Sequence, residues 1–156
     1  VALRLGVGEP ASYAQLAHEL GLSASQVHAS VARCRESGLV EQDEKRANVS
    51  ALREFLVHGL KYVFPATKGP TVRGVPTAHS AAPLSSKIRS GDTTVWPHPE
   101  GSARGESLAP LHKAAPGAAL FNPKLHRVLA LVDAIRAGRA RERALAASLL
   151  DKELGC

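Results

Sequence analysis

Residues 10–40 read PASYAQLAHELGLSASQVHASVARCRESGLV and carry the strongest structural signal in the chain. Ser12 is a suitable N-cap for a helix from Tyr13 to about Leu20, because its hydroxyl can accept a hydrogen bond from the first turn. Gly21 then ends this helix, since glycine enters the left-handed backbone region without steric cost. The pattern therefore predicts a short helix closed by a tight turn.

A second helix is expected directly after this turn. Ser23 is its N-cap, and Val27, Val31 and Cys34 recur at steps of four and three, which places them on one inner face. Residues 38–40, Gly-Leu-Val, end the helix and begin an extended segment. Residues 10–40 are therefore predicted to form two short helices that pack across a glycine turn.

This arrangement resembles the helix-turn-helix of winged-helix transcriptional regulators of the MarR and ArsR kind. The small Ala17 lets the two helices cross closely, and Gly21 permits the turn between them. The residues that carry the resemblance are Leu16-Ala17, Leu20-Gly21-Leu22-Ser23, Val27, Val31 and Gly38-Leu39-Val40. It covers only this part of the chain and implies sequence-specific binding of double-stranded DNA.

In such modules the second helix enters the major groove, and its outward residues near the N-terminus contact base edges. Gln26 can pair with adenine, Arg33 with guanine, and Ala29 can meet a thymine methyl group. The predicted DNA-contacting residues of this helix are Ser25, Gln26, His28, Ala29 and Arg33, with Ser23 placed for a phosphate. The alternative interpretation is that they form only the solvated face of an amphipathic helix.

The sequence departs from the family after Val40, where a winged helix would continue into a β-hairpin. Residues 41–47 read as a charged loop, and Asn48 reads as the N-cap of a third helix with an apolar stripe at Leu52, Phe55, Leu56 and Leu60. Two extended runs, at residues 61–65 and 71–78, could pair as a displaced wing. That wing would add Lys61, Lys68 and Arg73 to the DNA contacts, and Pro65 and Pro76 would keep its strands short.

The rest of the chain divides at the pair Asn122-Pro123. Residues 79–121 hold much of the proline, glycine and serine and predict an irregular segment, either mobile or held to the body by Trp96, Leu108 and Leu111. An asparagine followed by proline is a typical helix start, so residues 122–156 predict one kinked helix or two stacked ones. The apolar face of this C-terminal helical arm needs a partner, either the N-terminal module or a second copy of the chain.

Composition and motifs argue against an enzyme. The sequence has no glycine-rich phosphate loop, no Gly-x-Ser-x-Gly elbow and no carboxylate cluster. Its seven histidines show no convergent zinc-ligand spacing, so we expect neither a catalytic site nor a metal or other cofactor. No apolar run reaches 18 residues and no signal peptide is visible, which predicts a cytoplasmic protein without a membrane span.

Charge is distributed unevenly along the chain. Residues 1–60 hold six basic and seven acidic residues, whereas residues 61–156 hold fourteen basic and seven acidic ones. The basic charge that could attract DNA therefore lies mainly outside the proposed reading helix. Arg139, Arg141 and Arg143 form one such basic cluster, which could contact phosphate or be a solvated face.

The sequence thus predicts a mainly α protein with a small β-hairpin. We expect a winged-helix-like module over residues 1–78, an irregular segment over 79–121 and a helical arm over 122–156. The expected function is sequence-specific DNA binding by a homodimeric transcriptional regulator. The alternative is a winged-helix protein-interaction module, such as an adaptor or antitoxin-like partner, that does not bind DNA.

Overall fold

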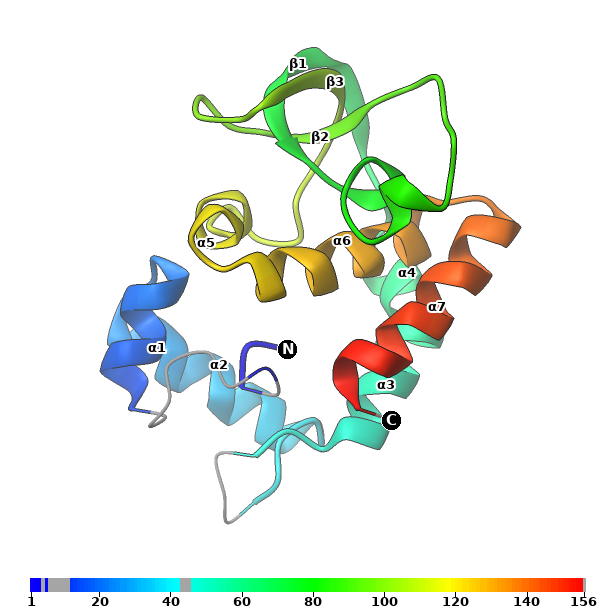
Figure 1. Cartoon of the computed structure of the whole chain (residues 1–156). Helices are drawn as coiled ribbons and strands as arrows, with labels where there is room; N and C mark the ends of the chain where they lie inside the picture. The colour runs from blue at the N-terminus through cyan, green and yellow to red at the C-terminus, as the bar shows by residue number, and fades with distance from the viewer. Residues whose placement is uncertain (4, 6–11, 43–45, 156) are drawn as a thin grey trace.

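The first two helices lie where the sequence predicts them. The computed structural model describes residues 1–3, 5, 12–42 and 46–155, and Figure 1 shows the arrangement of its helices and strands. Helix α1 spans Tyr13–Leu20 and helix α2 spans Ala24–Glu36. The side chains between them are buried, which holds the pair together; they are Leu16, Ala17, Val27 and Val31.

A longer helical stretch follows after Asn48. It consists of α3 (Val49–Glu54), a π-helical turn (Phe55–Gly59) and α4 (Leu60–Val63). The side-chain oxygen of Asn48 accepts a hydrogen bond from the main-chain N–H of Ala51 at 3.1 Å, which confirms the predicted N-cap. The predicted apolar stripe is also confirmed, with three members buried and Phe55 half-buried; the buried ones are Leu52, Leu56 and Leu60.

The strand predicted from residue 61 is wrong, because residues 60–63 are helical. Leu56 and Leu60 are buried four residues apart, so their packing carries the helix forward, and α4 lies against α6 (Pro123–Ala137). Residues 61–65 have a composition typical of strands, but the packing of the helix outweighs it, because local propensity is only a weak preference. Tyr62, Val63 and Phe64 remain exposed as a result.

Three strands form a small closed sheet. They are β1 (Lys68–Pro76), β2 (Thr94–Pro97) and β3 (Ala103–Leu108). β1 runs antiparallel to both partners, while β2 and β3 are parallel to each other. The pairing of β1 with β3 shifts register between Gly69 and Thr71, so Pro70 lies at an irregularity where its missing N–H costs no ladder hydrogen bond.

This sheet corrects two predictions. The extended run at residues 71–78 is largely β1, but its partners are β2 and β3 and not residues 61–65, so the displaced wing does not exist. Residues 79–121 are not an irregular segment, because they contain β2, β3 and helix α5 (Ala115–Phe121). Trp96 and Leu108 are fully buried, as expected of residues that hold this segment to the body.

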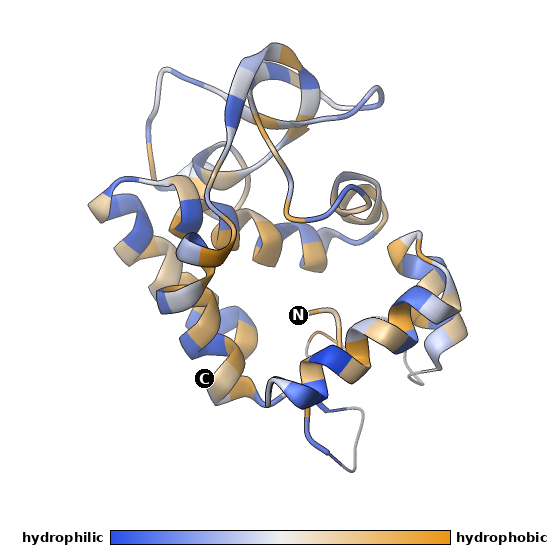
Figure 2. Cartoon of the chain, turned by 180° about the vertical axis from the view of Figure 1, so that it is seen from behind, coloured by the Kyte–Doolittle hydropathy of each residue, from blue (hydrophilic) through white to orange (hydrophobic). Residues whose placement is uncertain are grey.

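Helix α6 crosses the middle of the molecule, with the sheet on one side and α1, α2, α3 and α7 (Ala140–Leu154) on the other (Figure 1). Asn122 caps α6 by accepting a hydrogen bond from the N–H of Leu125 at 2.9 Å, which confirms the predicted helix start. All side chains of α6 from residue 130 to residue 136 are buried. Figure 2, seen from behind, shows the hydrophobic colour along this central helix.

Residues 122–156 were predicted to form one kinked helix or two stacked ones, and they form two helices, α6 and α7, that pack into the core. α7 lies along α6 and also contacts α3. Leu150 and Leu154 of α7 are fully buried in the same cluster as Val128 and Leu131 of α6. The chain itself therefore covers the apolar C-terminal face, and that face no longer argues for a second copy of the chain.

A buried polar cluster fastens the sheet to α6. The Oδ2 atom of Asp133 accepts hydrogen bonds from the Trp96 indole at 2.6 Å and the Thr77 hydroxyl at 2.9 Å. The Arg136 guanidinium lies 2.9 Å from Oδ1 of the same carboxylate and donates to the carbonyl oxygen of Ala109 at 2.6 Å. Burial raises the pKa of Asp133, and the charge of Arg136 and the donated hydrogen bonds oppose this rise.

A second ion pair, on the other side of α6, joins α3 to α7. The Nε and Nη2 atoms of Arg53 lie 2.6 and 2.9 Å from the two carboxylate oxygens of Asp151, a bidentate geometry. The hydrogen bonds from Arg53 lower the pKa of Asp151, so the folded state favours the ionised carboxylate. The stability from this pair is present above the unfolded-state pKa of aspartate and is lost as the pH falls through the lowered pKa.

We expect Asp151→Asn to lower the free energy of unfolding at pH 7 by about 1 kcal/mol, because both side chains are partly solvated and screened. The difference from the unsubstituted protein should disappear in strongly acidic solution. Urea unfolding at both pH values measures the effect, and Asp92→Asn, at an exposed position without an ion pair among the described residues, is the control. An equal loss at both pH values would assign the effect to packing instead of charge.

Candidate nucleic-acid interface

The turn between α1 and α2 has the geometry that its glycine predicts. Ser12 caps α1 by accepting a hydrogen bond from the N–H of Gln15 at 3.0 Å. Gly21 follows α1 with φ +63°, in the left-handed region, and the N–H of Leu22 donates to the carbonyl of Ala17 at 2.9 Å. These local contacts set the angle at which α2 leaves the turn.

The start of α2 is held by a capping box. The N–H of Gln26 donates to the hydroxyl of Ser23 at 3.2 Å, and the N–H of Ser23 donates to the side-chain oxygen of Gln26 at 2.9 Å. This reciprocal pair makes the first turn of α2 rigid. It also uses the amide oxygen of Gln26, so bidentate pairing of Gln26 with adenine would require the box to open.

The outer face of α2 is open to solvent. The inner side chains Val27 and Val31 are buried against α1 and the core, as the spacing predicts. All six residues predicted to contact DNA on or beside this helix are exposed; they are Ser23, Ser25, Gln26, His28, Ala29 and Arg33. The described part of the chain therefore leaves room for a partner along this face.

Arg33 and His28 on this face also have neighbours. The Nη2 atom of Arg33 donates to the hydroxyl of Ser30 at 3.0 Å, which leaves the other guanidinium donors available. The ring of His28 meets the ring of Tyr13 edge-on, with centroids 5.4 Å apart. Arg33 is thus the basic side chain on this outer face that can pair bidentately with a guanine.

A short antiparallel pairing directly after α2 was missed by the sequence analysis. Val40 and Ala47 form an antiparallel bridge, flanked by hydrogen bonds from Asn48 N–H to the Leu39 carbonyl at 3.0 Å and from Glu41 N–H to the Arg46 carbonyl at 2.9 Å. The segments on either side of residues 43–45 therefore pair with each other, at the place where a winged helix has its hairpin. The sequence feature that could have indicated this pairing is two apolar residues, Val40 and Ala47, on either side of a charged run.

The three basic residues assigned to the displaced wing lie elsewhere. Lys61 is on α4 with its Nζ atom 4.8 Å from the Tyr62 ring centroid, and Lys68 on β1 pairs with Glu106 at 2.6 Å. Arg73 is exposed on β1, opposite Arg104 of β3. Figure 1 places α4 and β1 away from α2, so the structure does not bring these residues together with the outer face of α2.

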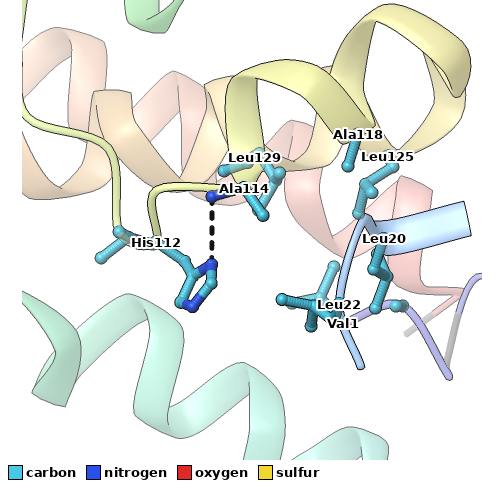
Figure 3. Close-up of a pocket in the computed structure, with 11 residues that line it drawn as sticks. Val1, Leu20, Leu22, His112, Ala114, Ala118, Leu125 and Leu129 are labelled. Atoms are coloured by element: carbon cyan, nitrogen blue, oxygen red, sulfur yellow. Dashed lines mark hydrogen bonds between the residues drawn. The ribbon is translucent and has the colours of Figure 1, made fainter. Parts of the chain in front are cut away.

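The inner side of the helix pair borders an apolar pocket of about 180 Å³. Figure 3 shows Leu20 and Leu22, from α1 and the turn, on one side of it and Ala118, Leu125 and Leu129 of α5 and α6 on the other. At its edge, the N–H of Ala114 donates to Nδ1 of His112 at 3.1 Å. Helix α1 contacts α5 beside this pocket, which holds the helix pair to the rest of the protein, and the outer face of α2 stays exposed.

Comparison with known proteins bears on the same region. Residues 9–41 match the winged helix-turn-helix DNA-binding family. This match covers α1, the turn and α2, and the chain thus carries a DNA-binding module of the winged helix-turn-helix type. No curated protein and no solved structure matches the chain.

Among the residues that the structure describes, no three or more His, Cys, Asp or Glu side chains gather where they could hold a metal ion. In the same residues, no helix has the length and apolar character needed to cross a membrane. The outer face of α2 is the candidate site because it is exposed and lies within the matched segment.

Proposed function

We propose that this protein binds double-stranded DNA sequence-specifically and acts as a transcriptional regulator. The observation that carries the proposal is the exposed outer face of α2, within a segment that matches winged helix-turn-helix DNA-binding domains. In such a module the second helix inserts into the major groove. The rigid capping box would present the first turns of α2 to the bases in one orientation.

The contacts that we propose follow from the position of each side chain on α2. Arg33 would pair with a guanine, Ala29 would meet a thymine methyl group, and Ser25 and His28 would contact base edges or phosphates. Ser23 and Gln26 would hold the helix start near a phosphate, since their side chains bond to each other's backbone. The paired residues Val40 and Ala47 would lie beside the groove, close to the DNA backbone.

We further propose that two copies act together, as a cytoplasmic homodimer. The support is the general geometry of such modules, which read paired half-sites about 34 Å apart in DNA with two-fold symmetry. A partner copy would double the number of phosphate contacts. This would compensate for the near-neutral charge of residues 1–60.

The same near-neutral charge favours a second candidate function, a protein-interaction module that keeps the winged-helix shape without binding DNA. A salt titration of binding to a random duplex discriminates between the two. A protein that contacts about six phosphates loses about a thousandfold in affinity between about 50 and 200 mM salt. Negligible affinity even at low salt would favour the interaction module.

We expect Arg33→Ala to weaken binding to the selected site by about 1–3 kcal/mol and to relax base preference at one position. Arg33 is exposed and bonds only to Ser30 within the described chain, so the fold should be unaffected. A gel-shift titration on a site selected from a random DNA library measures the change. Arg104→Ala, an exposed arginine on β3, is the matched control, and equal affinities of the two variants would remove Arg33 from the contacts.

A further inference from the structure

Two adjoining hollows lie on the side of the molecule away from α2. The first, of about 410 Å³, is bounded by β1, β3, the loop before β2 and the junction of α6 with α7. The second, of about 390 Å³, lies between residues 87–89 and the first turns of α7. They share Ile88, Arg89, Arg139 and Glu142 as common walls, and each is of the size that takes a small ligand.

The second hollow is lined by cations that have no partner within the described chain. Lys87 and Arg89 come from the loop, and Arg139 and Arg141 come from the start of α7. All four are exposed, and none forms an ion pair with another described residue. The one acidic residue in this lining, Glu142, is engaged by the main-chain N–H of Arg139 at 2.8 Å. Four positive charges against one carboxylate leave this hollow with an excess of positive charge, which attracts a compact anion.

The first hollow has a different chemistry. Its lining includes the carboxylate of Asp92 and the hydroxyl-bearing Ser90 and Thr94. The Nε2 atom of His79, in the same wall, lies 2.9 Å from the main-chain carbonyl oxygen of Asp92 and fixes the loop there. Glu106 is paired with Lys68 at 2.6 Å, which leaves Asp92 as an acceptor for hydroxyl groups.

We propose that the two hollows together bind a small phosphorylated ligand that carries hydroxyl groups, such as a sugar phosphate or a nucleoside monophosphate. The phosphate lies among Lys87, Arg89, Arg139 and Arg141, and the hydroxyl-bearing part lies in the first hollow against Asp92. Arg89 and Arg139 are central, because they line both hollows. This inference is independent of the proposed DNA-binding function.

The same basic groups would also attract the backbone of a nucleic acid, but two observations favour the small ligand. The start of α7 and helix α2 lie at opposite sides of the molecule (Figure 1), so a duplex seated on α2 does not also reach this groove. The first hollow also carries the carboxylate of Asp92, which forms no ion pair with another described residue and would repel a polyanion that continued into it. A ligand with one phosphate and a neutral body avoids that repulsion.

The test uses the full chain with three probes: inorganic phosphate, adenosine monophosphate and adenosine. Amide chemical shifts and calorimetry should show that inorganic phosphate and adenosine monophosphate bind, with shifts confined to residues 87–94 and 137–142, and that adenosine binds more weakly than its phosphate. Arg89→Ala and Arg139→Ala should each weaken binding of both phosphate-containing probes about tenfold, the loss of one strong charge-assisted contact. Arg104→Ala, an exposed arginine outside both hollows, should leave binding unchanged.

Two results would overturn the proposal. One is that inorganic phosphate produces no localised shifts, or shifts that persist in Arg89→Ala and Arg139→Ala. The other is that these two variants weaken binding to a random duplex while neither phosphate-containing probe binds, which would make the groove a contact for nucleic-acid backbone. Unfolding midpoints of all variants, expected to be equal because the substituted side chains are exposed, check that the fold is retained.

Discussion

Replacement of Asp133 by alanine is expected to lower the free energy of unfolding by about 3–5 kcal/mol. The side chain is 1% exposed and lies where α6 meets the sheet. Its removal leaves the buried guanidinium of Arg136 without a negative partner. It also leaves the Trp96 indole N–H and the Thr77 hydroxyl without their acceptor. Each of these buried groups then bears the cost of lost solvation.

The geometry of Arg136 makes the cluster sensitive to this change. Its Nη2 atom donates a hydrogen bond to the Ala109 carbonyl. The same atom forms an ion pair with Oδ1 of Asp133, but this contact does not have the geometry of a hydrogen bond. The Nε atom of Arg136 has no hydrogen-bond partner among the described residues. The carboxylate charge is thus the main compensation for a buried cation, and no other described side chain replaces it.

Urea unfolding followed by tryptophan fluorescence measures the prediction, because Trp96 is the single tryptophan of the chain and bonds to Asp133 directly. Asp92→Ala is the control, since Asp92 is exposed and a change there should stay within about 0.5 kcal/mol. Similar losses in the two variants would show that the Asp133 cluster does not anchor the sheet.

Replacement of Gly101 by alanine is expected to cost about 3 kcal/mol, at the upper end of the range for overpacking. Gly101 is buried between β2 and β3, and a Cβ atom at this position would overlap the main-chain carbonyl of Gly74 on β1. The obstructing atoms belong to a strand and cannot rotate away as a side chain would. The closure of the three-stranded sheet must therefore loosen to accept a methyl group.

Gly91→Ala is the matched control, because a Cβ atom at Gly91 would meet nothing within 4 Å. Its free energy of unfolding should stay within about 0.5 kcal/mol of the unsubstituted protein. Thermal unfolding monitored by Trp96 fluorescence compares the two variants, since Trp96 lies on β2. If Gly101→Ala were as stable as Gly91→Ala, the claim that Gly101 packs directly against the main chain of β1 would be contradicted.

The helix starts and the reading helix could be predicted from the sequence because their causes are local. Ser12, Ser23, Asn48 and Asn122 each cap a helix by a hydrogen bond to a residue three positions ahead. Gly21 ends α1 through its own φ angle. The outward face of α2 follows from the spacing of Val27 and Val31 on the inner side.

The partners of β1 could not be predicted in this way. Residues 61–65 and 71–78 both have the composition of strands, and proximity in sequence suggested that they pair. In the folded protein β1 pairs with β2 and β3, whose sequences are short and interrupted by proline and glycine. Strand pairing across such distances depends on which surfaces α6 and the loops leave open, and no local pattern encodes that.

The caps, the glycine turn and the spacing of apolar positions in residues 12–36 were enough to predict the helix-turn-helix and its exposed outer face. These features act within five residues along the chain. Packing of the whole chain decided the rest. It brought Asp133 to Thr77 and Trp96, 56 and 37 positions away, and it placed Arg89 beside Arg139 at one groove. Contacts between distant residues form only when burial of α6 brings their elements together, so the tertiary structure alone reveals them.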